Sequence, residues 1–264
     1  MPNSSILREK RALVFGAGGS VGAAVAKEFA AEGADVFLSG RTESHVEEVA
    51  QEIEASGGRA HVTALDALDE SAVDAYVDRV VREAGRIDVA FNAIGPLARD
   101  FGSGKLAVDL TVTEFMLPLT TIARSQFITA CAAARHMVRQ RSGVIMFLTG
   151  SPARPHIEGA SAIGAAFAAI ENLTRHLALE LGRVGVRAVC LRTSAMPDTR
   201  VIRDTMQGVV TEMNLTEDQA NQQLANQTML NISPRTSETA KVAAFLASDQ
   251  AKTMTGTQVM SEIR

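Results

Sequence analysis

The stretch Gly16-Ala17-Gly18-Gly19-Ser20-Val21-Gly22 separates two segments of different pattern. Before it, residues 12–15 form a short apolar run, which is typical of a buried parallel strand. After it, Val21, Val25 and Phe29 recur every four residues, as on the buried face of a helix. A glycine-rich turn between a strand and a helix presents backbone N–H groups to a phosphate. The stretch therefore predicts a dinucleotide-binding loop made by Gly16, Gly18, Gly19, Ser20, Val21 and Gly22.

Strand-like and helix-like patterns alternate along most of the chain. Further strand-like runs cover residues 36–38, 61–65, 87–92, 144–148, 186–191 and 257–260. Helical stripes lie between them, and Pro118 predicts a kink or a later start in the long helical pattern of residues 112–140. The alternation predicts an α/β fold: one Rossmann-type, doubly wound parallel sheet of about seven strands with helices on both faces.

Residues 193–233 depart from this alternation. The segment is rich in Gln, Asn and Thr, with only scattered Met, Leu and Ile. A long segment of weak periodicity more often covers a site than forms a domain of its own. We therefore expect a single domain over residues 1–264, with a lid-like insertion at 193–233.

Composition excludes several classes of function. The 264 residues are 46% hydrophobic and carry a net charge of −4, with acidic and basic residues interspersed, so we expect no nucleic-acid partner. No apolar run approaches the roughly 18 residues of a membrane span, and the first ten residues lack the apolar core of a secretion signal. Neither the histidines nor the two cysteines have metal-ligand spacing. We expect a cytoplasmic protein without a metal site.

The end of the second strand-like run bears on the choice of cofactor. A dinucleotide fold that prefers NAD carries an acidic residue about 20 residues after the loop, where it binds the ribose 2′-hydroxyl. This chain has Ser39-Gly40-Arg41 there instead. A guanidinium cannot accept that hydrogen bond, but it can bind a 2′-phosphate with two parallel donors. Arg41 therefore favours NADP (NADPH) over NAD.

Several motifs resemble those of the short-chain dehydrogenase/reductase family. Gly16-x-x-x-Ser20-x-Gly22 is similar to its Gly-x-x-x-Gly-x-Gly, with Ser20 in place of the middle glycine, and Asn92-Ala93-Ile94-Gly95 is similar to its Asn-Asn-Ala-Gly. Asp66 matches the family aspartate that contacts the adenine. The resemblance covers nearly the whole chain, and it implies that Asp66, Asn92 and Ala93 also bind the cofactor.

The same resemblance implies that the usual catalytic residues are missing. In the family, a Tyr-x-x-x-Lys pair delivers a proton to the carbonyl oxygen of the substrate, and a serine orients that carbonyl. Here the tyrosine position is Ile163, the lysine position is Phe167, and the serine falls on Gly150, with Ser151 next to it. The single tyrosine, Tyr76, belongs to an apolar helical stripe elsewhere. The sequence therefore assigns no catalytic residue.

A substrate pocket is expected at the same place. Ile163 and Phe167 are one helical turn apart and face the same way, so they either line an unusually apolar pocket or pack against the core or a neighbouring subunit. Ser151 and His156 follow the fifth strand at the carboxyl edge of the sheet, where ligands bind in α/β folds. They are the polar candidates to contact a substrate, with solvated loop residues as the alternative.

Three functions remain open on the sequence. The first is an NADP-dependent oxidoreductase that acts on a carbonyl or hydroxyl substrate with a different proton relay. The second is a catalytically silent cofactor-binding sensor or partner subunit, and the third is a non-redox lyase or isomerase on the same fold. The family resemblance also implies a homo-oligomer, either a dimer or a tetramer, in which small alanine side chains permit close helix packing.

Overall fold

The computed structural model describes residues 5–154 and 157–260, and its centre is one parallel sheet of seven strands. The strands are β1 (Arg11–Phe15), β2 (Asp35–Gly40), β3 (Arg59–Ala64), β4 (Val89–Asn92), β5 (Gly143–Gly150), β6 (Val186–Thr193) and β7 (Gln258–Met260). Their order across the sheet is β3-β2-β1-β4-β5-β6-β7. The strand order reverses direction between β1 and β4, which is the switch point at which doubly wound sheets bind dinucleotides.

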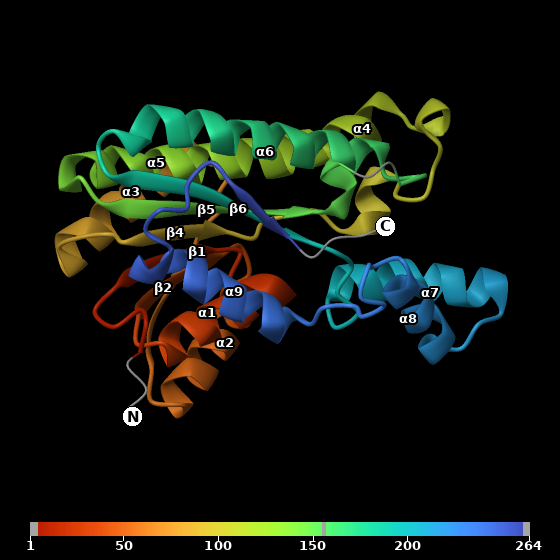
Figure 1. Cartoon of the computed structure of the whole chain (residues 1–264), viewed down its shortest axis with the longest axis horizontal. Helices are drawn as coiled ribbons and strands as arrows, with labels where there is room; N and C mark the ends of the chain where they lie inside the picture. The colour runs from red at the N-terminus through yellow and green to blue at the C-terminus, as the bar shows by residue number, and fades with distance from the viewer. Residues whose placement is uncertain (1–4, 155–156, 261–264) are drawn as a thin grey trace.

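Helices cover both faces of the sheet (Figure 1). They are α1 (Ser20–Ala31), α2 (Glu43–Ala55), α3 (Glu70–Ala84), α4 (Val112–Pro118), α5 (Arg124–Gln140), α6 (Ser161–Gly182), α7 (Arg200–Met213), α8 (Glu217–Asn226) and α9 (Thr236–Ala247). Helices α1, α2 and α9 lie on one face, and α3, α5 and α6 lie on the other. The predicted fold class is therefore confirmed. No helix in the described part of the chain is long and apolar enough to cross a membrane.

The core consists of two buried layers, one on each side of the sheet. In β1, Ala12 and Val14 belong to the layer beneath α1, whereas Leu13 and Phe15 belong to the layer beneath α3 and α5. Alternate strand residues point to opposite faces, so a strand covered on both sides needs apolar residues at every position. The continuous apolar runs in the sequence reflect this double burial.

The long helix over residues 112–140 changes type at Pro118. Helix α4 ends at Pro118, a π-helical turn η3 (Leu119–Ala123) follows, and α5 begins at Arg124. Proline lacks the N–H of a regular helix, and the π-helical turn follows it directly. The helix begins at Val112, before the proline, so the expected later start is wrong; at Pro118 the backbone stays helical and changes helix type.

The polar segment at 193–233 contains two helices that its weak periodicity did not predict. Helix α7 is capped by the Thr199 side chain, and α8 begins with a reciprocal capping box between Thr216 and Gln219. These caps fix where the helices begin. Helix α7 also has a half-buried apolar stripe at four-residue spacing, made by Ile202, Met206 and Val210. Both helices project beyond the carboxyl ends of the strands (Figure 1). The Asp198 carboxylate accepts hydrogen bonds from Thr236 N at 3.0 Å and Thr236 Oγ1 at 2.8 Å, which joins the two ends of the segment.

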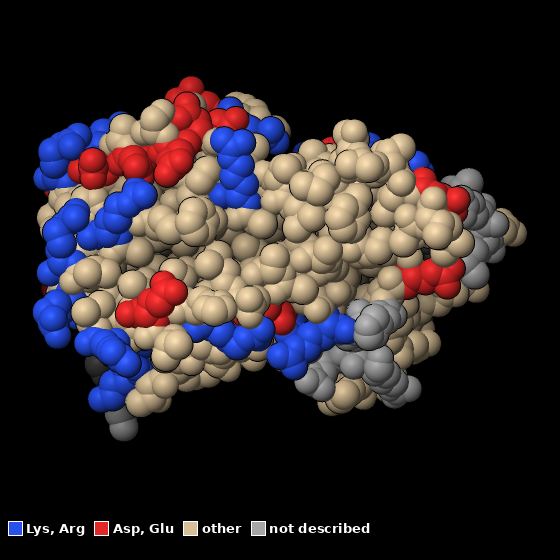
Figure 2. Space-filling view, turned by 90° about the horizontal axis from the view of Figure 1, so that it is seen from above, with Lys and Arg blue, Asp and Glu red and all other residues tan. Residues whose placement is uncertain are grey.

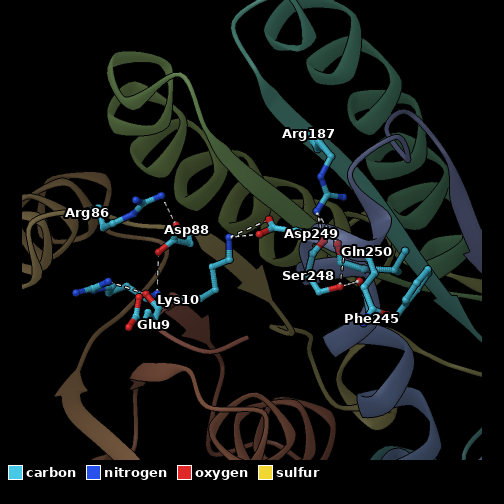
Figure 3. A network of polar contacts seen from close by, with 11 residues as sticks. Glu9, Lys10, Arg86, Asp88, Arg187, Phe245, Ser248, Asp249 and Gln250 are labelled. Atoms are coloured by element: carbon cyan, nitrogen blue, oxygen red, sulfur yellow. Dashed lines mark hydrogen bonds and ion pairs between the residues drawn. The ribbon is translucent and has the colours of Figure 1, made fainter. Parts of the chain in front are cut away.

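A polar network closes the opposite, amino-terminal edge of the sheet (Figure 3). The Arg187 guanidinium donates to the carbonyl oxygens of Leu246 at 2.8 Å, Ser248 at 3.3 Å and Met254 at 3.2 Å. Lys10 Nζ donates to both carboxylate oxygens of Asp249, at 2.9 and 3.1 Å. A cation at the carboxyl end of a helix satisfies its last carbonyls and complements its dipole. Arg187 therefore fastens the end of α9 to β6.

Replacing Arg187 by methionine is expected to lower the free energy of unfolding by about 2–3 kcal/mol, because charge-assisted hydrogen bonds to three backbone carbonyls are lost. Urea denaturation measures the change. The matched control is Arg183→Met, whose side chain is exposed nearby and whose effect should stay within about 0.5 kcal/mol. Equal effects of the two substitutions would contradict the assigned role of Arg187.

Candidate cofactor and active site

The glycine-rich loop lies at the switch point of the sheet. The backbone N–H groups of Gly16 and Ala17 both donate to the carbonyl oxygen of Ser39, at 2.9 and 3.0 Å, which ties the loop to the end of β2. Gly16 has φ +78°, a conformation that favours glycine, and its α-carbon lies close to the backbone of Ala93 after β4. A Cβ on Gly22 would lie 2.2 Å from the Gly16 carbonyl oxygen. Glycine is therefore required at both ends of the loop for the close approach of helix and strand.

The donor set of this loop fits a pyrophosphate. Helix α1 begins at Ser20, with Gly19 as its N-cap, and no acidic residue occupies its first turn. The first N–H groups of a helix have no partner within the helix and carry the positive end of its dipole. A carboxylate in this turn would repel a phosphate, and none is present. If a dinucleotide binds, Gly18 to Gly22 would hold its phosphates through backbone donors.

The other predicted cofactor residues lie at the same carboxyl edge. Arg41 is exposed directly after β2, and Asp66 is exposed after β3, where its carboxylate accepts a hydrogen bond from Leu68 N at 3.0 Å. Asn92 is buried at the end of β4; its Nδ2 donates to Thr129 Oγ1 at 2.9 Å, and its Oδ1 accepts from the N–H two residues later at 2.9 Å. The amide of Asn92 therefore shapes the loop that contains Ala93.

Phe167 and Gly150 fit together as a pair. Both Ile163 and Phe167 are half-buried on α6 and pack against the core layer beneath α3 and α5. A Cβ on Gly150 would lie 2.9 Å from Cε2 of the Phe167 ring. Real side chains hardly ever approach this closely, so a serine at 150 would require the ring to move. The aromatic ring at 167 and the glycine at 150 are therefore interdependent.

The predicted polar candidates are mostly committed to other contacts. Ser151 is buried, and its Oγ donates to the carbonyl oxygen of Thr193 at 3.1 Å. His156 lies outside the described residues. Tyr76 packs edge-on against Phe15, with ring centroids 6.0 Å apart, and burial raises its pKa. Its position in the core agrees with the expectation from its helical stripe.

A buried ion pair beneath Phe167 was not predicted. Glu171 follows Phe167 by one turn of α6, and Arg192 stands near the end of β6; both side chains are nearly inaccessible to solvent. The guanidinium donates to both oxygens of the carboxylate. Thr149 Oγ1 donates to Glu171 at 3.4 Å, and Arg154 Nε lies 3.7 Å from the same carboxylate. The spacing of four residues between 167 and 171 is the signal that places this charge on the inward face of α6.

The cysteines carry no chemistry in this arrangement. Both are free; Cys131 is partly buried and Cys190 is fully buried in β6. Burial raises the pKa of the Cys190 thiol to about 12, so it is protonated and inert at neutral pH. Residues 5–154 and 157–260 hold no group of three or more His, Cys, Asp or Glu that could bind a metal ion.

A cleft opens between the segment after β4 and helix α7. It has a volume of about 320 Å³ and is lined by Ala98, Arg99, Ser103, Asp204, Thr205 and Gln207. One wall is the short 3₁₀ helix η1 (Ala98–Phe101) and the other is α7. Ala98 and Phe101 also pack in one apolar cluster with Ile163. The apolar cluster that contains Ile163 therefore packs behind the η1 wall of the cleft.

Comparison with known proteins agrees with this geometry. The sequence model of a family described as enoyl-(acyl carrier protein) reductase matches residues 16–262. The short-chain reductase protein NovJ of Streptomyces niveus is 36% identical over 182 residues, which cover 69% of this chain and 67% of NovJ. The chain belongs to the short-chain dehydrogenase/reductase family. The 7α-hydroxysteroid dehydrogenase of Escherichia coli K12 is a more distant relative, 26% identical over 97% of this chain and 94% of its own.

Solved structures of short-chain dehydrogenases/reductases share the whole architecture. NAD⁺-bound xylitol dehydrogenase superposes with a TM-score of 0.86 at 26% identity, covering 96% of this chain and 98% of that one. A 7α-hydroxysteroid dehydrogenase with NADH and a 7-oxo bile acid superposes with a TM-score of 0.83 at 25% identity over the full length of both chains. Both relatives bind a nicotinamide cofactor.

Proposed function

We propose that this chain is an NADP(H)-binding member of its oxidoreductase family in which hydrocarbon replaces the proton-delivering residues. Of the three functions left open by the sequence, the catalytically silent cofactor-binding protein fits the geometry best. The observation that carries this proposal is the closeness of the Phe167 ring to Gly150, where a built Cβ would lie only 2.9 Å from Cε2 of the ring, so the ring in its present place leaves no room for a serine side chain. A dinucleotide-binding loop is retained, whereas the carbonyl-activating residues are replaced together.

The chemistry explains why these replacements matter. Bound NADPH would supply hydride, but reduction of a carbonyl also requires a proton donor beside the oxygen as negative charge develops there. Ile163 and Phe167 cannot donate, and the Ser151 hydroxyl already donates to the Thr193 carbonyl. Hydride transfer by the usual relay is therefore not expected. A relay through Ser151 would require that hydrogen bond to break.

Titration and turnover together test the proposal. NADPH is expected to bind saturably in isothermal titration, and the nicotinamide absorbance should then stay constant across a panel of ketones, with no loss above the protein-free rate. Consumption of NADPH that is abolished by Ser151→Ala would instead establish the oxidoreductase with an altered relay. If no nicotinamide dinucleotide binds, the cofactor-binding proposal is wrong.

Arg41 carries the proposed preference for NADP over NAD. It is exposed directly after β2, and residues 39–42 contain no carboxylate to bind a ribose 2′-hydroxyl. Arg41→Ser is expected to weaken NADP⁺ binding by roughly 10- to 100-fold, the effect of losing a charge-assisted hydrogen bond, while NAD⁺ binding changes little. Calorimetric titration of both cofactors measures this split. The control is Arg82→Ser on the exposed side of α3, and equal losses for both cofactors in Arg41→Ser would contradict the assignment.

We also propose a homo-oligomer built on the face formed by α5 and α6. Figure 2 shows a broad band of uncharged side chains on this face, flanked by charged residues. Phe127 on α5 and Leu179 on α6 are 52% and 73% exposed, which is unusual for side chains of this size. We expect a dimer or tetramer in light scattering at micromolar concentration, and a dimer-to-monomer shift in Phe127→Glu/Leu179→Glu. A wild-type monomer would contradict it.

The proposal also covers the domain organisation, the location in the cell and the role of the 193–233 segment. The chain is proposed to form one domain that acts in the cytoplasm, with the 193–233 segment as a lid at the carboxyl edge of the sheet. The support for the lid is its position beyond the carboxyl edge of the sheet and its contact with η1 across the cleft.

A further inference from the structure

Helix α7 starts against the glycine-rich loop, although 180 residues separate them in the sequence. The backbone N–H of Arg200, the first residue of α7, donates to Ser20 Oγ at 3.2 Å. Thr199, the N-cap of α7, accepts from Ile202 N at 3.4 Å. Ser20 is itself the first residue of α1. One hydroxyl group therefore lies between the amino-terminal ends of two helices.

The two helix ends present the same charge to each other. Neither α1 nor α7 carries an acidic residue in its first turn. Each amino-terminal end carries about half a positive charge from the aligned peptide dipoles, so an anion between them is favoured. Asp198 lies directly before the N-cap of α7, and its carboxylate accepts hydrogen bonds from Thr236. A phosphate at the amino end of α1 would stabilise both helices at once.

Two further contacts hold the start of α7 and one wall of the cleft. At the base of the segment, Asp198 accepts two hydrogen bonds from Thr236, which fixes its two ends together. Across the cleft, Arg99 Nη1 lies 3.8 Å from Asp204 Oδ2, with side chains 70% and 35% exposed. Exposed ion pairs of this length add little to stability. Ser20 therefore joins the start of α7 to the glycine-rich loop, and Asp198 joins the base of the segment to Thr236.

We propose that Ser20 is a positioning residue through which a bound dinucleotide fastens α7 over the cleft. In its contact with α7 the hydroxyl acts as acceptor, so its own proton is available to donate to a phosphate oxygen at the same time. Glycine, which the family pattern has at this position, can make neither contact. The inference rests on the proposed NADP(H) binding. It adds that binding of this cofactor stabilises the position of α7 in the lid through Ser20.

Hydrogen exchange measured by mass spectrometry tests this coupling. Backbone amides of residues 200–207 should exchange more slowly when the wild-type protein is saturated with NADP⁺. In Ser20→Gly and Ser20→Ala that gain should fall roughly 3- to 10-fold, the effect expected for one hydrogen bond, whereas Ser20→Thr should restore it. The control is Thr216→Ala, which should loosen α8 and leave the NADP⁺-dependent gain in α7 intact.

The outcomes separate the coupling from the cofactor proposal. NADP⁺ binding is measured by calorimetry on each variant, and exchange in β1 and β4 reports whether each variant is folded. If wild-type protein does not bind NADP⁺, the proposed function itself fails. If NADP⁺ binds and the gain in α7 is equal in wild type, Ser20→Gly and Ser20→Ala, the coupling through Ser20 is wrong.

Discussion

The variant Gly150→Ser/Ile163→Tyr/Phe167→Lys is expected to reduce simple ketones with NADPH at least about 100-fold faster than the unaltered chain, since a positioned general acid typically contributes 10²–10⁴-fold. The change restores a phenol to deliver the proton, an ammonium to lower its pKa, and a hydroxyl to orient the carbonyl. Loss of nicotinamide absorbance, with chromatographic detection of the alcohol, measures the gain.

All three substitutions are needed because the positions are coupled. Gly150→Ser alone would press its Cβ against the Phe167 ring, at 2.9 Å in the unaltered geometry. The matched control is Gly150→Ser/Ile163→Phe/Phe167→Lys, which differs only by the missing phenolic hydroxyl and should stay near background. Equal activity of the two triple variants would show that the proton comes from elsewhere. Circular dichroism and NADPH titration establish that both variants are folded and bind cofactor.

Glu171→Gln is expected to cost about 3–5 kcal/mol of unfolding free energy, because it leaves the Arg192 guanidinium buried without its anionic partner. That is a large part of the total stability of a typical protein, about 5–15 kcal/mol. Urea denaturation at neutral pH measures it. The double variant Glu171→Leu/Arg192→Met should be less destabilised than the sum of its single changes, because it removes both buried charges.

An exposed pair supplies the control for this effect. Lys27 Nζ and Glu52 Oε2 lie 2.5 Å apart with side chains 40% and 61% exposed. Lys27→Met should change stability by only about 0–1 kcal/mol. A Glu171→Gln protein within about 1 kcal/mol of the unaltered chain would contradict the account of a buried, mutually dependent pair.

The fold was predictable because burial on both sides of a parallel sheet leaves a direct record in the sequence. Strand β1 is apolar from Ala12 to Phe15, and it is followed by a helix with a four-residue stripe. Helix α7 also has such a stripe, but it lies within a segment rich in Gln, Asn and Thr, so the composition of the segment concealed it. Helix α8 has few apolar residues and begins at the capping box of Thr216.

The site was predictable only in part. The order of strand, glycine loop and helix placed the cofactor residues at one edge, because every parallel strand presents its carboxyl end there. The family resemblance pointed to Ile163 and Phe167, and the helical repeat placed both side chains on one face. The dependence of Phe167 on Gly150 and the pairing of Glu171 with Arg192 join segments that are distant in the chain. Such contacts are set by tertiary packing and have no spacing rule.

A crystal structure of the chain with NADP⁺ would test directly whether hydrocarbon stands in place of a proton donor beside the nicotinamide. We expect the dinucleotide to lie along the glycine-rich loop, with its 2′-phosphate beside Arg41. We expect side-chain carbon atoms of Ile163 and Phe167 at the place where a substrate carbonyl would meet the nicotinamide. A side-chain hydroxyl, imidazole or ammonium group within hydrogen-bonding distance of that carbonyl position would contradict it.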